Sequence, residues 1–423
     1  MKKLITLFMV CTQLFAIENR VRLVTYNLEN YGGDGYNNKT ETSRNPHYRT
    51  IINAIDPDIL VVQEIYGAFD GDSRFLNDVL NHENNIYASA FIDQKNDANG
   101  NDVWHDIGVY FKNQMFQPLS IREVEMSEGY LRDALEVKLK YNETGDTIIV
   151  YGLHFKAGES EAAERQQEAR KLRNYLNTLP ENTTFVVCGD FNIYTSSEEA
   201  WKRLTEEQQD DDGRVFDPVE QVGNWHNNSY YKAIHTQSTR YESGGLDDRF
   251  DFILISGGIK EHHKIEYIPG TYTAFGNDGN HFNDSVNWQT NNSVSSEIAD
   301  ALYAAADHLP VYADFDFTGT VGVVEEITQP DNFVLEQNYP NPFNPRTTIA
   351  FQVPFPSHIK LAVYDLMGNE ITTILNREMG PGRYHQVWDG TDNNHRRAAS
   401  GIYFLLFQSS SGAKISQKMV LVK

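Results

Sequence analysis

Six polar motifs, spread over nearly three hundred residues, each adjoin an apolar run, and this repeated placement limits the possible folds more than any other feature of the chain. The apolar runs have the character of β-strands, so each polar side chain would lie where a strand leaves a sheet. Open α/β sheets bind ligands along such a rim. The sequence therefore predicts one site assembled from distant segments. The motifs are Thr25-Tyr26-Asn27, Gln63-Glu64, Gly152-Leu153-His154, Gly189-Asp190-Phe191-Asn192, Arg249-Phe250-Asp251 and Asp307-His308-Leu309-Pro310.

Strand-like and helix-like segments alternate between about residues 20 and 317. Residues 21–25 have the two-residue period of a half-buried strand, and residues 160–179 carry the apolar stripe of an amphipathic helix. Alternation with uneven connections predicts an α/β fold of layered sheets covered by helices. The polar connections 195–249 and 257–306 are long enough to shape a binding cleft or to be partly disordered.

The first sixteen residues have the pattern of a secretory signal. Met1-Lys2-Lys3 supplies positive charge, an apolar stretch follows, and Ala16 is the small residue expected at a cleavage site. The stretch is too short to span a bilayer, and no later apolar run indicates a transmembrane segment. Cleavage would leave Cys188 as the single thiol, so no internal disulfide is expected. The sequence thus predicts a secreted or cell-surface protein.

The charge of the chain is strongly negative but unevenly placed. The 423 residues include 36 basic and 59 acidic side chains, a net charge of −23. Residues 331–423 carry 9 basic and 7 acidic side chains, so the first 330 residues carry 27 and 52. Such an acidic body is not attracted to DNA at long range. It does not exclude a phosphate substrate, because a bound divalent cation inverts the local field.

The character of the sequence changes after a linker-like stretch at residues 318–332. Residues 333–423 contain short alternating segments separated by Gly, Pro, Asp and Asn, which is typical of a small immunoglobulin-like β-sandwich. No cluster of acids or imidazoles in this part indicates catalysis. We therefore expect chemistry only in residues 20–317.

The polar motifs contain the ligand types that a hard divalent cation needs. Mg²⁺ binds one or two carboxylates and keeps coordination positions for water and substrate. Glu64 follows the apolar run at 59–62 and is the best single candidate, with Asn27 and Asp307 completing or supporting its site. Asp190 could orient or deprotonate an attacking water, while Asn192 could donate to a phosphate oxygen.

Two histidines could act on one phosphoryl group, one by stabilising negative charge and the other by protonating the leaving oxygen. Asp251 could hydrogen-bond to one nitrogen of His308 and fix its tautomer. His154 would be the second imidazole, and Arg132 could hold a phosphate oxygen. Each signal alone is weak, since an Asp-His pair is more often a structural contact and Arg132 is more often a salt-bridged strand residue. The prediction therefore rests on the whole set of motifs, in their order along the chain.

This ordered set resembles the endonuclease/exonuclease/phosphatase superfamily over about residues 20–317. The resemblance implies a four-layer sandwich of two mixed β-sheets flanked by helices. It also implies divalent-metal-dependent cleavage of phosphate esters. The residues that carry it are Asn27, Gln63-Glu64, Arg132, His154, Gly189-Asp190-Phe191-Asn192, Arg249-Phe250-Asp251 and Asp307-His308-Leu309-Pro310-Val311.

Carried over to this chain, the resemblance assigns a role to each motif. Glu64 would be the metal ligand, with Asn27 and Asp307 in the same site. Asp190 and Asn192 would position water and phosphate. The expected cofactor is Mg²⁺, with Mn²⁺ or Ca²⁺ as alternatives.

The histidines indicate which branch of this superfamily the chain resembles. Asp251 and His308 match its coupled Asp-His pair. His154 matches the branch with a second histidine, as in pancreatic-type deoxyribonucleases and sphingomyelinases. Residues 246–249 depart from the run found in inositol polyphosphate phosphatases, and no exposed aromatic hairpin of the membrane-active sphingomyelinases is evident in the sequence.

The C-terminal segment resembles the sorting domain of bacterial type IX secretion substrates, which implies passage through an outer membrane. Outer-membrane secretion machinery is therefore an expected partner. His395 departs from the pattern, because a Gly is usual after Asn394. The matching residues are Asn338-Tyr339-Pro340-Asn341-Pro342-Phe343-Asn344-Pro345, Val363-Tyr364-Asp365, Trp388-Asp389-Gly390, Ser400-Gly401-Ile402-Tyr403 and Lys418-Met419-Val420-Leu421-Val422-Lys423.

The sequence as a whole predicts an exported, metal-dependent phosphodiesterase, with a nuclease acting on DNA or RNA as the first hypothesis. A phospholipid or small-molecule phosphoesterase is the alternative within the enzymes. A surface protein that only binds phosphate is a third hypothesis, from a different class. Because every expected chemical position holds a competent residue, this third hypothesis ranks last.

Overall fold

The computed structural model describes residues 19–33, 40–67, 70–92, 106–126, 133–261, 263–317, 332–338, 341–355, 357–379, 382–393 and 396–422. The predicted signal at residues 1–16 and Arg132 lie outside these ranges, as does all of the predicted linker except its last residue. The chain divides into two units, Met1–Val321 and Gly322–Lys423, and each is considered by itself. None of the helices in the described ranges is both long and apolar enough to cross a bilayer.

The first unit contains a seven-stranded mixed sheet. Its central strands β1 and β2 are parallel, while β13 and β4 pair antiparallel on either side of them. The strand order is β11 (Ile265–Tyr267), β13 (Val311–Phe317), β1 (Arg20–Tyr31), β2 (Ile59–Ile65), β4 (Asp106–Lys112) and β3 (Tyr87–Phe91), with β12 (Thr273–Ala274) paired to β13.

A six-stranded sheet of similar construction forms the second layer. Here β7 and β8 are the parallel pair, with β6 and β10 antiparallel on either side. The strand order is β5 (Phe116–Val124), β6 (Ala134–Tyr141), β7 (Thr147–His154), β8 (Phe185–Asp190), β10 (Asp251–Ser256) and β9 (Val215–Phe216).

The two sheets pack face to face through one buried apolar core. Val61 and Val109 of the first sheet share this core with Val150, Val186 and Ile253 of the second. At the closest approach, a Cβ on Gly152 of β7 would lie 2.7 Å from Ile107 Cγ2 and 2.8 Å from Val61 Cγ1. Only glycine fits there without moving the sheets apart.

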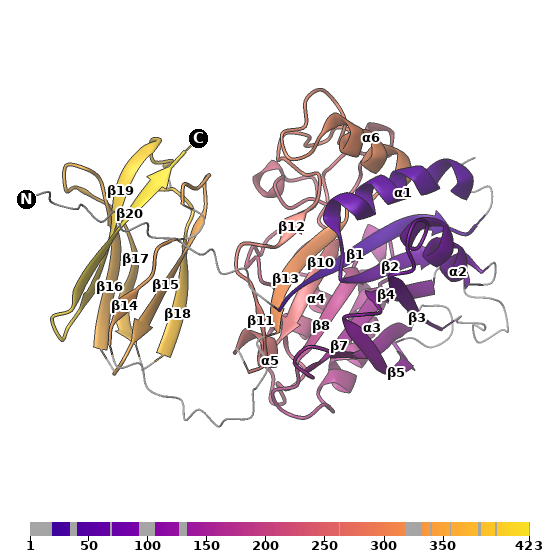
Figure 1. Ribbon diagram of the computed structural model, residues 1–423, viewed down its shortest axis with the longest axis horizontal. Coiled ribbons are helices and arrows are strands. Elements are labelled where there is room, and N and C mark those ends of the chain that lie inside the picture. The colour runs from indigo at the N-terminus through magenta and orange to yellow at the C-terminus, as the bar shows by residue number, and fades with distance from the viewer. Residues whose placement is uncertain are drawn as a thin grey trace, which may run out of the picture. The chain divides into compact units, whose positions relative to one another are not determined.

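Helices cover the outer face of each sheet, as Figure 1 shows for the first sheet and α1. Residues of α1 and α6 enter the apolar cluster on the outer face of the first sheet, and residues of α3 and α4 do so on the second. The predicted four-layer α/β sandwich is confirmed. The helices are α1 (Glu41–Ile55), α2 (Gly71–Phe75), α3 (Ala162–Leu176), α4 (Glu199–Thr205), α5 (Gly257–Lys260) and α6 (Ser296–Ala305).

Two details differ from the sequence reading. Helix α6 lies inside the stretch expected to be a long polar connection, where Ser295 caps it by accepting a hydrogen bond from Ile298 N. Arg165 and Arg173 of α3 are fully buried, although the charged residues of an amphipathic helix usually face solvent. Arg165 pairs with Glu198, and Arg173 pairs with Asp211, so partners outside the helix compensate their burial.

The second unit is all β, as predicted. Both of its sheets contribute to one apolar core that includes Phe351, Leu361 and Phe407. One sheet has the order β14 (Val334–Leu335), β15 (Thr347–Val353) and β18 (Gly382–Trp388). The other has the order β17 (Glu370–Met379), β16 (Ser357–Tyr364), β19 (Gly401–Ser409) and β20 (Lys414–Leu421).

Candidate active site

The strand directions bring most of the polar motifs to one edge of the two packed sheets. Parallel pairing sets Asn27 beside Gln63 in the first sheet and His154 beside Asp190 in the second. Asp251 begins β10 directly opposite Asp190, because these two strands are antiparallel. His308 comes just before β13, whose first residues pair with the segment of β1 that leads to Asn27. The topology therefore explains why residues 280 positions apart can meet.

Asn27 does not lie at a strand end, which corrects the sequence reading, whereas Glu64 is the last residue but one of β2. Both occur where the pairing register shifts inside a strand, between Asn27 and Tyr31 of β1 and between Val62 and Ile65 of β2. Glu64 has a φ of 58°, in the left-handed region that non-glycine residues rarely occupy. Irregularities of this kind redirect side chains next to functional sites.

Glu64 is held by hydrogen bonds from two residues of the last part of β1. Its Oε1 accepts from Asn27 Nδ2 at 3.2 Å, and its Oε2 accepts from the backbone amide of Asn30 at 3.1 Å. Its side chain is 19% exposed, whereas those of His154 and Asp190 are 3% exposed. Glu64 is thus the carboxylate of this group that solvent can reach.

Asp190 lies at the centre of the site, between two imidazoles. Its Oδ2 accepts a hydrogen bond from Asn27 Nδ2 at 3.1 Å and lies 3.4 Å from His154 Nε2 and 3.7 Å from His308 Nε2. Burial raises the pKa of Asp190 to about 7. The positive charge of His308 lowers this pKa, and the negative charges of Asp251 and Glu64 raise it.

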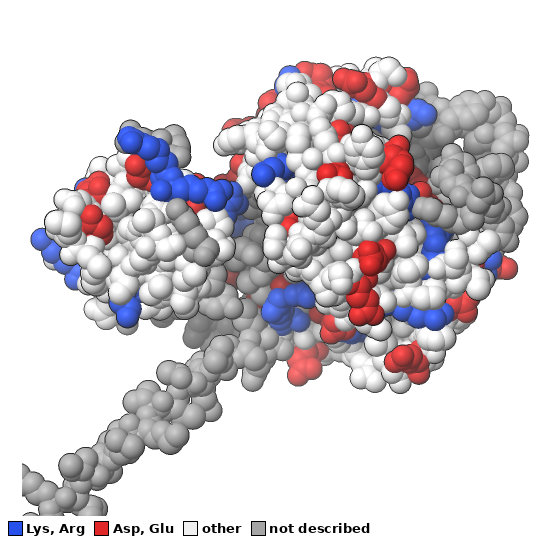
Figure 2. All heavy atoms as spheres, turned by 90° about the horizontal axis from the view of Figure 1, so that it is seen from above, with Lys and Arg blue, Asp and Glu red and all other residues white. Residues whose placement is uncertain are grey.

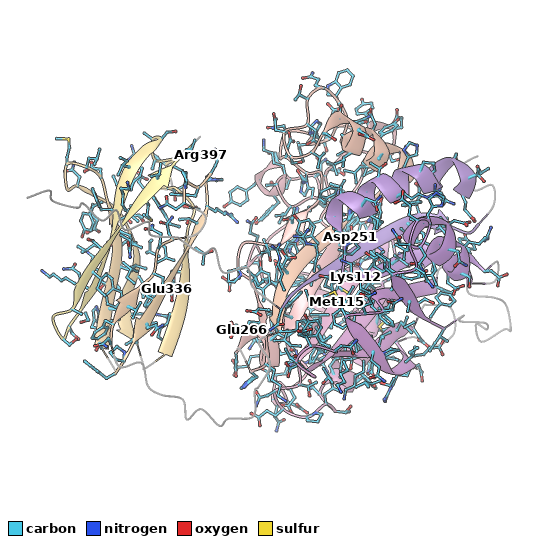
Figure 3. The ribbon with its side chains drawn as sticks, in the orientation of Figure 1. Lys112, Met115, Asp251, Glu266, Glu336 and Arg397 are labelled. Atoms are coloured by element: carbon cyan, nitrogen blue, oxygen red, sulfur yellow. The ribbon has the colours of Figure 1, made fainter. Side chains whose placement is uncertain are left out.

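His308 forms the predicted pair with Asp251, which is labelled in Figure 3. Its Nδ1 lies 2.8 Å from Asp251 Oδ2 in a buried contact. Burial acts to lower the pKa of His308, but the negative charges of Asp251 and Asp190 outweigh it and hold that pKa well above the ordinary value. Within the described chain, the other oxygen of Asp251 is buried without a hydrogen-bond partner. The Asp251 carboxylate therefore acts on the site through His308.

Gln237 is a site residue that the sequence reading missed. Its Nε2 lies 2.9 Å from His308 Nε2, and its backbone forms bridges with both His308 and Asp248. Rotation of the carboxamide exchanges its donor for its acceptor, so Gln237 suits either protonation state of the imidazole. No motif marks this glutamine, because it lies in a long connection with no periodic pattern.

The remaining predicted residues are less firmly placed. Asn192 follows Asp190, donating its backbone amide to Asp190 Oδ1 at 3.0 Å and its side-chain Nδ2 to the carbonyl of Phe155 at 3.1 Å. In the described ranges, the Asp307 carboxylate forms no hydrogen bond or ion pair with Glu64 or Asn27. Asp307 and Arg132 therefore stay predictions as a metal ligand and a phosphate contact.

The donor set around Glu64 fits a hard divalent cation. It combines a partly exposed carboxylate with the buried carboxylate of Asp190, the carboxamide of Asn27 and a neighbouring imidazole, His154, 3.8 Å from Glu64 Oε1. Two carboxylates so close together repel each other unless a proton or a cation lies near them. An ion held mainly by Glu64 would keep positions open for water and a phosphoryl oxygen.

The profile of the Endonuclease/Exonuclease/phosphatase family matches residues 24–272, more than half of the chain. The chain belongs to this family. The profile of the secretion system C-terminal sorting domain matches residues 337–423. Both resemblances seen in the sequence are thereby confirmed. A comparison with curated proteins finds no match.

Several solved structures are similar to this chain at low sequence identity. The human Nocturnin catalytic domain with bound sulfate is 16% identical, with a TM-score of 0.48 over 71% of this chain and 95% of that one. A mannosyl-6-phosphatase of Bacteroides thetaiotaomicron is 17% identical, with a TM-score of 0.47 over 70% and 99%. D. rerio TDP2 with a single-strand DNA product is 14% identical, with a TM-score of 0.47 over 70% and 98%. We transfer no functional property from these proteins.

Family membership makes the first unit a phosphoric ester hydrolase of a family that uses divalent metals. The sorting domain marks the protein for secretion and export to the surface. The protein is therefore an exported hydrolase. On the face drawn in Figure 2, acidic and basic side chains of the larger unit form separate small groups and not a continuous basic tract.

Proposed function

We propose that this exported hydrolase is a metal-dependent phosphodiesterase that cleaves nucleic acid outside the cell. The observation that carries the proposal is the position of Asp190, whose Oδ2 lies within 3.7 Å of both His154 Nε2 and His308 Nε2. A carboxylate between two imidazoles can handle the proton of an attacking water while both rings face the phosphoryl group.

Each residue has a separate task in the proposed reaction. Water attacks phosphorus, and Asp190 accepts the proton that this water loses. His308, held at Nδ1 by Asp251, and His154 donate hydrogen bonds to the phosphoryl oxygens, where negative charge increases in the transition state. One of the two imidazoles gives its proton to the leaving oxygen as the phosphorus–oxygen ester bond breaks.

Glu64, supported by Asn27 and Asp307, would hold Mg²⁺. A bound divalent cation supplies Lewis-acid stabilisation of a phosphoryl oxygen. Asn192 would orient the phosphate with a hydrogen of its carboxamide, and Arg132 would contact a phosphate oxygen. The second histidine, His154, supports a phosphodiester substrate, since it matches the branch with deoxyribonucleases and sphingomyelinases.

A phospholipid or small-molecule phosphoesterase is the second candidate. The charge of the chain favours it, because residues 1–330 carry 27 basic against 52 acidic side chains. A polynucleotide is drawn to a protein mainly by a continuous basic surface, whereas a small ester needs only the cation and the two imidazoles. Binding to phosphate without cleavage ranks last.

A substrate panel tests the proposal. Plasmid DNA, RNA, sphingomyelin and an aryl phosphodiester are incubated with the protein and Mg²⁺, with and without EDTA. Nucleic acid cleavage that EDTA abolishes and that Glu64→Gln lacks supports a nuclease. Cleavage of sphingomyelin or the aryl ester alone supports the second candidate. Cleavage that persists in EDTA refutes the metal-dependent mechanism, and phosphate binding without any cleavage supports the third hypothesis.

A further inference from the structure

Three ligand-type side chains form a group separate from the Glu64 site. One ligand atom from each of His226, Asp247 and Asp248 lies within 4.8 Å of the other two. The shortest of these contacts joins His226 Nδ1 and Asp248 Oδ1 at 2.8 Å. None of these three residues belongs to any of the six motifs, and the proposed reaction uses none of them.

The spacing of this group suits a single cation. Metal–ligand distances of about 2.0–2.3 Å allow two ligands of one ion to be at most about 4.6 Å apart, and ligands at a right angle are about 3 Å apart. All three ligand atoms lie within 4.8 Å of one another, and His226 Nδ1 is 2.8 Å from Asp248 Oδ1, so small side-chain rotations would bring the three atoms to the separations that one ion requires. Two carboxylates at this separation also repel each other, and a cation removes that repulsion.

The donor types indicate which cations fit. An imidazole with two carboxylates is a mixed nitrogen and oxygen set, which suits Mn²⁺ or Zn²⁺ better than Mg²⁺ or Ca²⁺, whose ligands are oxygens. The His226 side chain is 39% exposed and that of Asp248 is 10% exposed, so an ion can enter from solvent. Water would complete its coordination.

The backbone around the group is fixed by hydrogen bonds. The amide of Asn227 donates to the carbonyl of Asp247 at 2.8 Å, and the amide of Thr236 donates to that of Asp248 at 2.7 Å. Gln237 exchanges backbone hydrogen bonds with the same two aspartates. The backbone that carries the two aspartates is therefore fixed before any ion binds, which favours a metal site.

The group also adjoins the active site. Gln237 pairs through its backbone with both Asp248 and His308, while its side chain contacts the His308 ring. The ring of Tyr194 packs edge-on against His226, with the centroids 5.2 Å apart. The segment around Gln237 thus joins the group to His308 of the active site.

We propose that His226, Asp247 and Asp248 form a second divalent-cation site beside the active site, and that it binds Mn²⁺ or Zn²⁺. This site is independent of the Glu64 site and of the identity of the substrate. An ion there would fix the segments around His226 and Gln237 and so stabilise the position of His308.

Counting Mn²⁺ ions tests this site. The full chain without an affinity tag is treated with EDTA, exchanged into buffer and titrated with Mn²⁺, while free Mn²⁺ is measured by electron paramagnetic resonance. Wild type should bind two ions per chain. Asp247→Asn and His226→Ala should each bind one, with affinity for the lost ion at least tenfold weaker. Glu64→Gln should lose the other ion, and its combination with Asp247→Asn should bind none.

Controls separate a lost site from a lost fold. Glu242→Gln removes an exposed acid of the same region and should keep both ions. Thermal melting in EDTA should show the Asp247→Asn and wild-type proteins unfolding within a few degrees of each other. If His226→Ala does not fold, Asp247→Asn alone decides. A folded Asp247→Asn or His226→Ala protein that binds as many ions as wild type overturns the proposal. A wild-type stoichiometry of one that Glu64→Gln leaves at one refutes the Glu64 site instead.

Discussion

The contact between Asp251 and His308 allows a quantitative prediction. Asp251→Asn keeps the shape of the side chain but replaces the charged acceptor that His308 Nδ1 contacts at 2.8 Å. A hydrogen bond to a charged group contributes about 1.5–3 kcal/mol, so kcat/KM should fall roughly 10- to 150-fold if this energy stabilises the transition state. Initial rates on an aryl phosphodiester with saturating Mg²⁺ measure the loss.

The double variant distinguishes this cause from a structural one. If Asp251 acts only through His308, Asp251→Asn should cost little in a protein that already carries His308→Ala. Losses that multiply across the two variants would refute the coupling. Melting temperatures are recorded alongside, because Asp251 is fully buried and a general loss of stability would lower all the rates together.

Two further predictions concern single carboxylates. Asp190→Asn should lower turnover by at least about a hundredfold, the usual scale of general base catalysis, while leaving the fold intact by circular dichroism; near wild-type turnover would remove Asp190 from its proposed role. Despite its burial, Asp278 has a pKa held well below the ordinary value by hydrogen bonds from the backbones and side chains of Asn280 and Asn292 and from His281. The ionised Asp278 carboxylate contributes its full stabilisation above about pH 4, the pKa of an aspartate in the unfolded chain. This stabilisation is lost as the pH falls through the lower pKa that Asp278 has in the folded protein. Urea melts should therefore show Asp278→Asn about 2 kcal/mol less stable than wild type at pH 7, with a smaller difference at pH 3; an equal difference at both pH values would contradict this account.

The sequence predicted the elements whose periodicity is strong. The β7, β8 and β10 strands are mostly apolar because both of their faces are buried, whereas β13 alternates apolar residues with Asp314 and Asp316. Helix α6 was missed because it follows a long polar stretch. Its cap at Ser295 and its alanine-rich sequence, with Ala301, Leu302 and Ala305 on the buried face, were local signals that could have revealed it.

The sequence predicted an active-site residue only where a polar side chain follows the apolar pattern of a buried strand. Asp190 and His154 end buried strands, so the sequence alone indicates that their side chains need partners. The register shifts that redirect Asn27 and Glu64 depend on the pairing of neighbouring strands, which no local pattern encodes. Gln237 contacts His308 through a connection whose path is set by tertiary packing, so it carries no sequence signal.

The dependence of the site on sheet packing leads to a last prediction. Asn27 belongs to the first sheet and Asp190 to the second, yet their side chains share a 3.1 Å hydrogen bond, so the distance between the sheets sets the site geometry. At Gly152 an added Cβ would approach the branched side chains of Ile107 and Val61 to less than 3 Å.

These branched side chains have few alternative rotamers, so Gly152→Ala must separate the sheets or strain them, at a cost of about 1–3 kcal/mol. Activity should fall further than stability explains, because the separation pulls Asn27 and Glu64 away from Asp190 and His154. Gly412→Ala is the stability control, since its positive φ strains an added Cβ in a turn of the second unit where no atom lies within 4 Å. Rates per folded molecule that match wild type in Gly152→Ala would show that the two halves of the site tolerate a change in the spacing of the sheets.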